Sequence, residues 1–170
     1  VAPKGFKAGT TYCGIKIAKD SLDLGIIFSE YPATGAALFT TNQIYAAPVG
    51  LSKKIIQKGC VRAFIINSGN ANACTGEQGY KDAGEMLRIA AKCLKISADE
   101  LLVASTGIIG RPLPMDKIAV GIKTAAASLG NAPEHGNAMA RAIMTTDTKQ
   151  KDIAVKVKIS NKDVTIGGIT

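Results

Sequence analysis

The segment Val61-Arg62-Ala63-Phe64-Ile65-Ile66-Asn67 is an apolar run rich in β-branched and aromatic residues, which is typical of a buried strand. A helical pattern follows over 76–94, where apolar side chains recur at spacings of three and four residues. The sequence Ser97-Ala98-Asp99-Glu100 then predicts a capped turn, and Leu101–Ala104 is a second short apolar strand. Strand and helix therefore alternate through the centre of the chain.

The chain before Val61 is predicted to be mostly strand. Apolar runs and alternation predict strands at 11–18, 22–29, 36–40 and 49–51. The short polar link 18–21 suggests a hairpin between the first two, and the last is expected to lead into a helical turn over 52–58.

The chain after Ala104 is predicted to contain two helices and then two strands. The helices are expected at 115–129 and 134–144, and the strands at 153–159 and 164–169 with a turn at 161–163. Strands first, then helices, then paired strands predict a layered α+β or α/β sandwich. With no repeat, low-complexity segment or linker in its 170 residues, the chain is expected to form a single domain over 1–170.

The composition favours a globular protein of the cytoplasm. Hydrophobic residues make up 46% of the chain and the net charge is +8, with the lysines spread along its length. Because there is no tryptophan and there are few aromatic residues, stacking on nucleic acid is not expected. The apolar runs are short, so no membrane-spanning segment is expected.

The four cysteines favour free thiols over a metal site. Cys13, Cys60, Cys74 and Cys93 form no Cys-x-x-Cys pair, and His135 is the one histidine, so no metal is expected. Free buried thiols are typical of cytosolic proteins. A nucleophilic Cys74 would need His135 as its base, and that pairing is not favoured.

The segment Ser105-Thr106-Gly107 follows the strand 101–104 directly. A hydroxyl and a backbone N–H at such a turn can donate to an oxyanion in acyl transfer, and glycine permits close approach. Many strands end in such turns, however, so this segment alone decides little. The chain also has no convincing nucleophile–base pair to act with it.

Two further polar segments leave alternatives open. Asn67–Gly76 lies between a strand and a helix, where α/β proteins bind ligands, or it is a loop whose asparagines satisfy their own backbone. Met144–Thr148 is either a helix exit with side-chain capping bonds or a polar wall that binds a substrate.

Together these segments resemble the ornithine acetyltransferase (glutamate N-acetyltransferase) family. The resemblance covers the whole chain in order. Its most specific parts are Ala104-Ser105-Thr106-Gly107-Ile108-Ile109-Gly110-Arg111, Pro114-Met115 and Arg141-Ala142-Ile143-Met144-Thr145-Thr146-Asp147-Thr148. Gly5-Phe6, Asn67–Gly76 and Ile166-Gly167-Gly168-Ile169-Thr170 also look like that family.

The resemblance implies an enzyme made as a precursor that cuts itself before a threonine. The new N-terminal threonine of the second, β, subunit is the nucleophile, and its own amine can serve as base. This chain then corresponds to the α subunit. It ends within a predicted strand, and the family's Lys-Gly-x-Gly-Met segment and the cleavage site are expected after Thr170. The implied fold is an αββα-type sandwich of the N-terminal-nucleophile kind, completed by the β subunit in an α2β2 or higher assembly.

The family's site residues carry over to three positions. Thr106 and Gly107 match the oxyanion-hole pair, and Thr145 matches a substrate-binding threonine. The implied reaction moves acetyl from N-acetylornithine to glutamate in arginine biosynthesis and releases ornithine. No cofactor is implied, although acetyl-CoA serves some members as a co-substrate. The alternatives are a self-cleaving amidohydrolase or aminopeptidase, and a basic binding module without enzyme activity.

Overall fold

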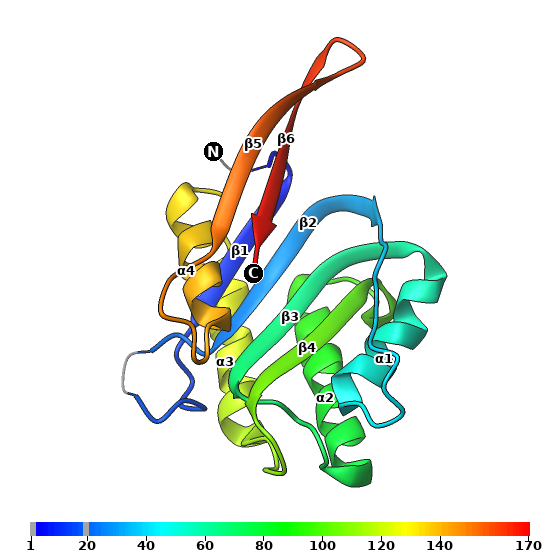
Figure 1. The fold of residues 1–170 in the computed structure, drawn as a ribbon, viewed down its shortest axis with the longest axis vertical. Helices are drawn as coiled ribbons and strands as arrows, with labels where there is room; N and C mark the ends of the chain where they lie inside the picture. The colour runs from blue at the N-terminus through cyan, green and yellow to red at the C-terminus, as the bar shows by residue number, and fades with distance from the viewer. Residues whose placement is uncertain (1–2, 19–20) are drawn as a thin grey trace.

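The computed structural model describes residues 3–18 and 21–170, and its centre is a four-stranded sheet (Figure 1). The strand order is β1-β2-β3-β4. The strands are β1 Phe6–Thr11, β2 Leu24–Thr34, β3 Cys60–Asn70 and β4 Leu101–Ile108. β1 pairs with β2, and β2 with β3, in antiparallel fashion, whereas β4 is parallel to β3. The carboxyl ends of β3 and β4 therefore meet at one edge of the sheet.

Helices lie on both faces of this sheet. The helices are α1 Ala47–Ile55, α2 Gly76–Leu94, α3 Met115–Ala127 and α4 Pro133–Ile143. A β-carbon on Gly9 would contact Ala125 of α3, whereas one on Gly25 would contact Met139 of α4. Because Gly25 pairs with Thr10, the residue next to Gly9, these contacts lie on opposite faces. Figure 1 shows α4 in front of β1, and α2 and α3 behind the sheet.

The hydrophobic core lies between the sheet and α2 and α3. Strand side chains at alternate positions are fully or almost fully buried there; they are Leu24, Ile26, Ile65, Leu101 and Val103. Helix side chains close the core from the other side; they include Met86, Ala90, Ile118 and Ile122. Burial of this apolar surface is the main force that holds the strand ends in place.

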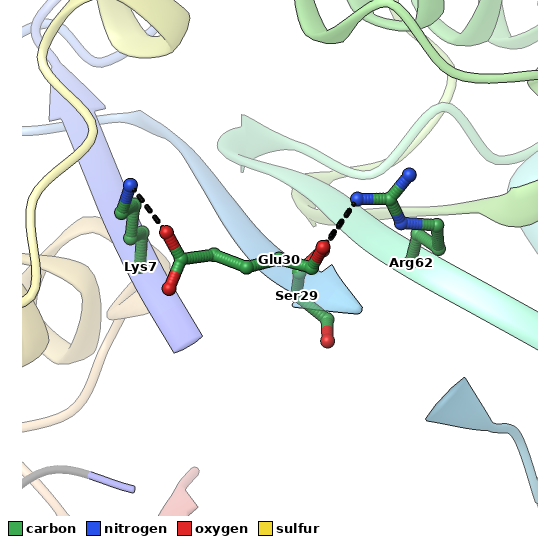
Figure 2. Close-up of polar contacts among 4 residues, drawn as sticks. All are labelled: Lys7, Ser29, Glu30 and Arg62. Carbon is green, nitrogen blue, oxygen red and sulfur yellow. Dashed lines mark hydrogen bonds and ion pairs between the residues drawn. The ribbon is translucent and has the colours of Figure 1, made fainter. Parts of the chain in front are cut away.

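A bulge in β2 is held by an arginine at the amino end of β3, away from the carboxyl ends of β3 and β4. The register of β2 on β3 shifts between Phe28 and Ala33. The Arg62 guanidinium donates to the carbonyl oxygens of Ser29 (3.2 Å) and Glu30 (2.8 Å) at this point. Figure 2 shows these residues together with the ion pair of 2.7 Å between Lys7 and Glu30. These contacts join β1, β2 and β3.

Most of the predicted elements are confirmed. The strand at β3, the helix over 76–94 and the capping box from Ser97 to Glu100, which begins the 3₁₀ turn Ala98–Glu100, form as expected. The two later helices are confirmed within two residues. The paired strands are β5 Asp152–Ile159 and β6 Lys162–Ile169, which form a separate antiparallel hairpin. The layered α+β arrangement is confirmed, and a sandwich completed by a second subunit stays a prediction.

The strand predicted over 11–18 is wrong, although the predicted hairpin pairing with the next strand is confirmed. The strand is Phe6–Thr11, and Thr11 pairs with Leu24. The chain leaves the sheet after Thr11 because the backbone N–H groups of 13–16 donate to the Asp23 carboxylate and not to a neighbouring strand. The predicted link 18–21 lies partly outside the described residues.

Two further strand predictions are wrong. Residues 36–40 form no strand, since the chain departs from the sheet after Thr34 and Leu38 lies in solvent. Residues 49–51 belong to α1, which begins with Pro48 in its first turn and continues into the 3₁₀ turn Ile56–Lys58. Proline is well suited to a first helical turn because its missing N–H needs no partner there.

Across the described ranges, none of the helices combines the length and the apolar character needed to cross a membrane.

Candidate active site

The candidate site forms where β3 and β4 end side by side. The parallel register places Ser68 opposite Thr106 and Gly69 opposite Gly107. Gly107 has φ +132°, and a β-carbon there would lie 2.4 Å from the carbonyl carbon of Gly69. A side chain at Gly107 is therefore excluded both by the backbone angle and by contact with the neighbouring strand.

Thr106 and Ser105 face opposite sides of the sheet. Ser105 Oγ donates to Asn67 Oδ1 (2.6 Å) on the side of the sheet that packs against α2 and α3. Alternation along the strand directs Thr106 to the other side, where it lines a cleft. Within the described residues, the Thr106 hydroxyl makes no hydrogen bond with the protein. Its donor is accordingly available to a ligand.

Three buried asparagines hold the loop that follows β3. Asn67 Nδ2 donates to the Asn70 carbonyl oxygen (2.9 Å), and Asn70 Nδ2 donates to the carbonyl oxygens of Arg111 (3.2 Å) and Pro112 (3.0 Å). Asn72 bonds Gly79 and Thr75 at the start of α2. The prediction that these asparagines satisfy backbone groups is confirmed. Because the loop also borders the cleft through Gly69 and Asn70, the ligand-binding alternative stays open.

The cleft has a volume of about 1070 Å³ and is formed by four separate segments. They are the loop at 15–18, the end of β3 at 69–70, the end of β4 with the loop that follows it (106–114), and the end of α4 with the residues after it. Thr106, Gly107 and Thr145 all lie on its surface. The structure thus brings together the three residues that the resemblance singled out, although Thr145 is far from the others in sequence.

A side-chain hydrogen bond joins the end of α4 to the sheet. Ser68 Oγ donates to the carbonyl oxygen of Ala142, and both residues are buried. Ser68 lies next to Gly69 and opposite Thr106. This bond therefore sets the position of the Thr145 segment relative to Thr106.

The segment 144–148, which follows α4, forms a hydrogen-bonded exit from that helix and also lines the cleft. The Thr145 N–H donates to Asp147 Oδ2 (3.3 Å), and Lys151 pairs with the same carboxylate. The hydrogen bond from Lys151, followed by the Thr145 N–H, lowers the pKa of Asp147. The two interpretations offered for 144–148 are thus compatible, because Asp147 holds the turn while Thr145 faces the cleft.

The loop at 13–16 is held by a buried carboxylate that the sequence analysis did not identify. Asp23 is fully buried and accepts the N–H groups of Cys13 (2.7 Å), Gly14 (3.0 Å), Ile15 (2.7 Å) and Lys16 (3.2 Å). The available signal was an aspartate directly before the apolar run of β2. This loop forms the wall of the cleft that faces Gly69.

The charged side chains on the cleft are mainly basic. Lys16, Arg111 and Arg141 line it, and among the described residues its one acidic lining residue, Asp147, is paired with Lys151. Burial lowers the pKa of Lys16, and the charge of Asp23 opposes this shift. The Lys16 amine donates to the Leu22 carbonyl oxygen (2.8 Å). The cleft therefore suits a ligand with carboxylate groups.

The structure does not bring Cys74 and His135 together. Cys74 lies exposed in the loop before α2, and His135 is in the first turn of α4, against Gly130. Neither residue lines the cleft. Over residues 3–18 and 21–170, no three His, Cys, Asp or Glu side chains gather where they could hold a metal ion.

Comparison with known proteins gives a consistent result. The model of the ArgJ family matches residues 7–170. The arginine biosynthesis bifunctional protein ArgJ of Caldanaerobacter subterraneus is 49% identical over 166 residues, which are 98% of this chain and 40% of the relative. That of Symbiobacterium thermophilum is 47% identical over 169 residues, 99% of this chain and 42% of the relative. The chain thus spans about 40% of the length of the curated relatives it matches.

Two crystal structures have the same fold. The arginine biosynthesis bifunctional protein ArgJ of Bacillus halodurans superposes with a TM-score of 0.91 at 39% identity, covering 99% of this chain and 86% of that one. Ornithine acetyltransferase of Mycobacterium tuberculosis, complexed with ornithine, superposes with a TM-score of 0.90 at 39% identity, covering 99% of this chain and 89% of that one. These matches confirm the resemblance drawn from the strand-end and helix-end motifs, and the chain belongs to the ArgJ family.

Proposed function

We propose that this chain is the α subunit of a glutamate N-acetyltransferase (ornithine acetyltransferase) of arginine biosynthesis and carries half of its active site. The observation that carries the proposal is the cleft on which Thr106, Gly107 and Thr145 meet. These residues come from two distant parts of the chain, and each matches a functional position of the family. Family membership supports the same assignment.

The nucleophile is proposed to lie on a second chain cut from the same precursor. The lengths of the relatives support this. This chain covers 40% of the curated sequence from C. subterraneus but 86% of the crystallised chain from B. halodurans. The crystallised chain is accordingly little longer than this one, as expected of a subunit separated from a longer precursor.

Acetyl transfer in this proposal takes place in two steps. The partner's N-terminal threonine attacks the acetyl carbonyl of N-acetylornithine, its amine accepts the hydroxyl proton, and ornithine leaves with a proton on its nitrogen. The amine of glutamate then attacks the acetyl-threonine ester, and the threonine hydroxyl is restored as N-acetylglutamate forms. Each attack places negative charge on the carbonyl oxygen.

Thr106 and Gly107 are assigned to that oxygen. The Thr106 hydroxyl and the Gly107 N–H are the proposed donors, and the loss of one such donor typically lowers kcat by about 10²–10³-fold. Thr145 is assigned to binding the substrate. The basic side chains Lys16, Arg111 and Arg141 suit the carboxylates of both substrates. The proposal requires no cofactor, and acetyl-CoA is a possible second donor.

The test uses the complete enzyme, purified with its partner chain and incubated with N-acetylornithine in the presence and absence of glutamate. The proposal expects N-acetylglutamate to form with glutamate and little acetate to form without it. Acetate release that is independent of glutamate would instead indicate an amidohydrolase. N-terminal sequencing of the partner chain is expected to give threonine, and any other residue would exclude the proposed nucleophile.

A further inference from the structure

The proposed oxyanion donors lie in the turn formed by residues 105–112, which begins within the last four residues of β4 and continues beyond the end of that strand. Gly107 is exposed and has φ +132°, β4 ends at Ile108, and the chain continues exposed through Arg111. Donors of this kind stabilise charge well only if they are already in position, to within about 0.5 Å, before the reaction. Neighbouring groups must therefore hold the turn in place.

The beginning of the turn is held by Asn67. This side chain is fully buried, and its register partner on β4 is Ser105. Its Oδ1 accepts the Ser105 hydroxyl (2.6 Å), and its Nδ2 donates to the Asn70 carbonyl oxygen (2.9 Å). One amide thus connects the residue before Thr106 with the loop that leaves β3.

The end of the turn is held by Asn70. Its Nδ2 donates to the carbonyl oxygens of Arg111 and Pro112, and its Oδ1 accepts the N–H of Asn72 (2.8 Å). Between these two attachments Gly107 rests on the backbone of Gly69 and Asn70. Segment 67–70 therefore contacts the turn at both ends and in its middle, and backbone hydrogen bonds from Ala71 to Ile108 and from Gly110 to Ala73 add to these contacts.

We propose that Asn67, acting through Ser105, is a positioning residue for the oxyanion donors Thr106 and Gly107, with Asn70 holding the far end of the same turn. This inference rests on the proposed function. Asn67 touches no reacting atom in this scheme. Its amide keeps the donors aimed at the oxygen that becomes charged, so its loss lowers kcat and leaves KM nearly unchanged.

A double-mutant cycle in the complete enzyme tests this inference. Ser105→Ala removes the hydroxyl bonded to Asn67 and is expected to lower kcat about tenfold, with KM within about twofold. Thr106→Ala removes one of the donors that Ser105 positions. If Ser105 acts through them, the double variant loses much less than the product of the two separate losses.

Ser52→Ala is the matched control. Ser52 is a buried serine on α1 whose hydroxyl bonds Val103, also on β4, through both the N–H (3.0 Å) and the carbonyl oxygen (2.7 Å). Its loss is expected to lower the melting temperature at least as much as Ser105→Ala. It leaves kcat within about twofold, because Val103 lies before the turn. Ser105→Thr keeps a hydroxyl and is expected to restore most of the lost kcat.

A second pair of variants keeps the inference testable if Ser105→Ala folds poorly. Asn67→Asp removes the donor to Asn70, whereas Asn72→Asp makes the same change at another fully buried asparagine, one that bonds the start of α2. The first is expected to lower kcat at least fivefold more than the second at equal stability.

The outcomes distinguish a failure of the positioning role from a failure of the proposed function. If the enzyme transfers acetyl but the kcat losses of Ser105→Ala and Thr106→Ala multiply fully in the double variant, the positioning role alone is overturned. An unchanged kcat in Ser105→Ala has the same consequence. Equal kcat losses in Asn67→Asp and Asn72→Asp also overturn it. Absence of acetyl transfer by the unsubstituted enzyme overturns the proposed function, and the positioning role with it.

Discussion

Gly107 rests on Gly69 so closely that a β-carbon on Gly107 would lie 2.4 Å from the carbonyl carbon of Gly69. The two glycines are register partners at the ends of the parallel strands β3 and β4. Both glycines line the cleft. The contact makes glycine necessary at position 107.

Gly107→Ala is expected to abolish most of the activity and to lower stability. The added methyl group must displace the β3 backbone, and φ +132° is strained for any L residue with a side chain. We expect kcat for acetyl transfer to fall by more than about 10²-fold, because the proposed donors move away from the oxyanion. Steady-state kinetics with N-acetylornithine and glutamate, together with thermal unfolding, measure both effects.

Gly84→Ala is the control for this change. Gly84 is in the middle of α2, where a β-carbon would meet nothing within 4 Å. Alanine is favoured over glycine in a helix by about 1 kcal/mol, so this variant is expected to be at least as stable as the wild type and fully active. If Gly107→Ala behaved like Gly84→Ala, the close contact between the strand ends would have no functional role.

Thr106→Ala is expected to lower kcat by about two orders of magnitude, as the loss of one oxyanion donor typically does. Thr106→Ser, which keeps the hydroxyl, is the matched control and is expected to keep most of the activity. Because the Thr106 hydroxyl makes no hydrogen bond with the described residues, its removal should leave the melting temperature nearly unchanged. Wild-type turnover in Thr106→Ala would remove this residue from the mechanism.

Thr145→Ala is expected to raise KM for N-acetylornithine, by about tenfold if the hydroxyl makes one hydrogen bond to the substrate. Thr148 belongs to the same segment and is exposed but does not line the cleft, so Thr148→Ala serves as the control. Steady-state kinetics on both variants separate KM from kcat. A KM that changes equally in the two variants would contradict the binding role of Thr145.

The regular elements of the core could be predicted from sequence because their signals are local. Apolar spacing of three and four marked α2, and the apolar run at 61–67 marked β3. The same local patterns misassigned 36–40 and 49–51. An apolar run becomes a strand only where a neighbour with free backbone groups is present, and such partners are set by the whole fold.

The candidate site was predictable in part. The motifs around Thr106 and Thr145 identified two walls of the cleft through the family resemblance. The third wall depends on Asp23, whose partners are seven to ten residues earlier in the chain. The bond between Asn67 and Ser105 spans 38 residues. Hydrogen bonds between side chains and groups this far apart in the sequence leave no periodic pattern, so they could not be predicted from the sequence.

Asp23→Asn is expected to destabilise the protein by roughly 2–4 kcal/mol, since a buried carboxylate that accepts several N–H groups is replaced by an amide whose NH₂ faces donors. Urea unfolding measures the change. Asp99→Asn is the control, because Asp99 pairs with Lys58 at the surface, where an ion pair contributes about 0–1 kcal/mol. Equal losses in the two variants would show that the loop at 13–16 does not depend on Asp23.

Cys13 is expected to make the protein less stable at alkaline pH. Burial, followed by the negative charge of Asp23, raises the pKa of this thiol from 9.0 to about 12. The folded state thus favours the protonated thiol, and this contribution is complete below pH 9 and is lost as the pH rises from about 9 to 12. Cys13→Ser, which does not ionise in this range, should therefore lose less stability than the wild type between pH 8 and pH 11. Urea midpoints measured for both proteins across this range test the prediction, and parallel curves would contradict it.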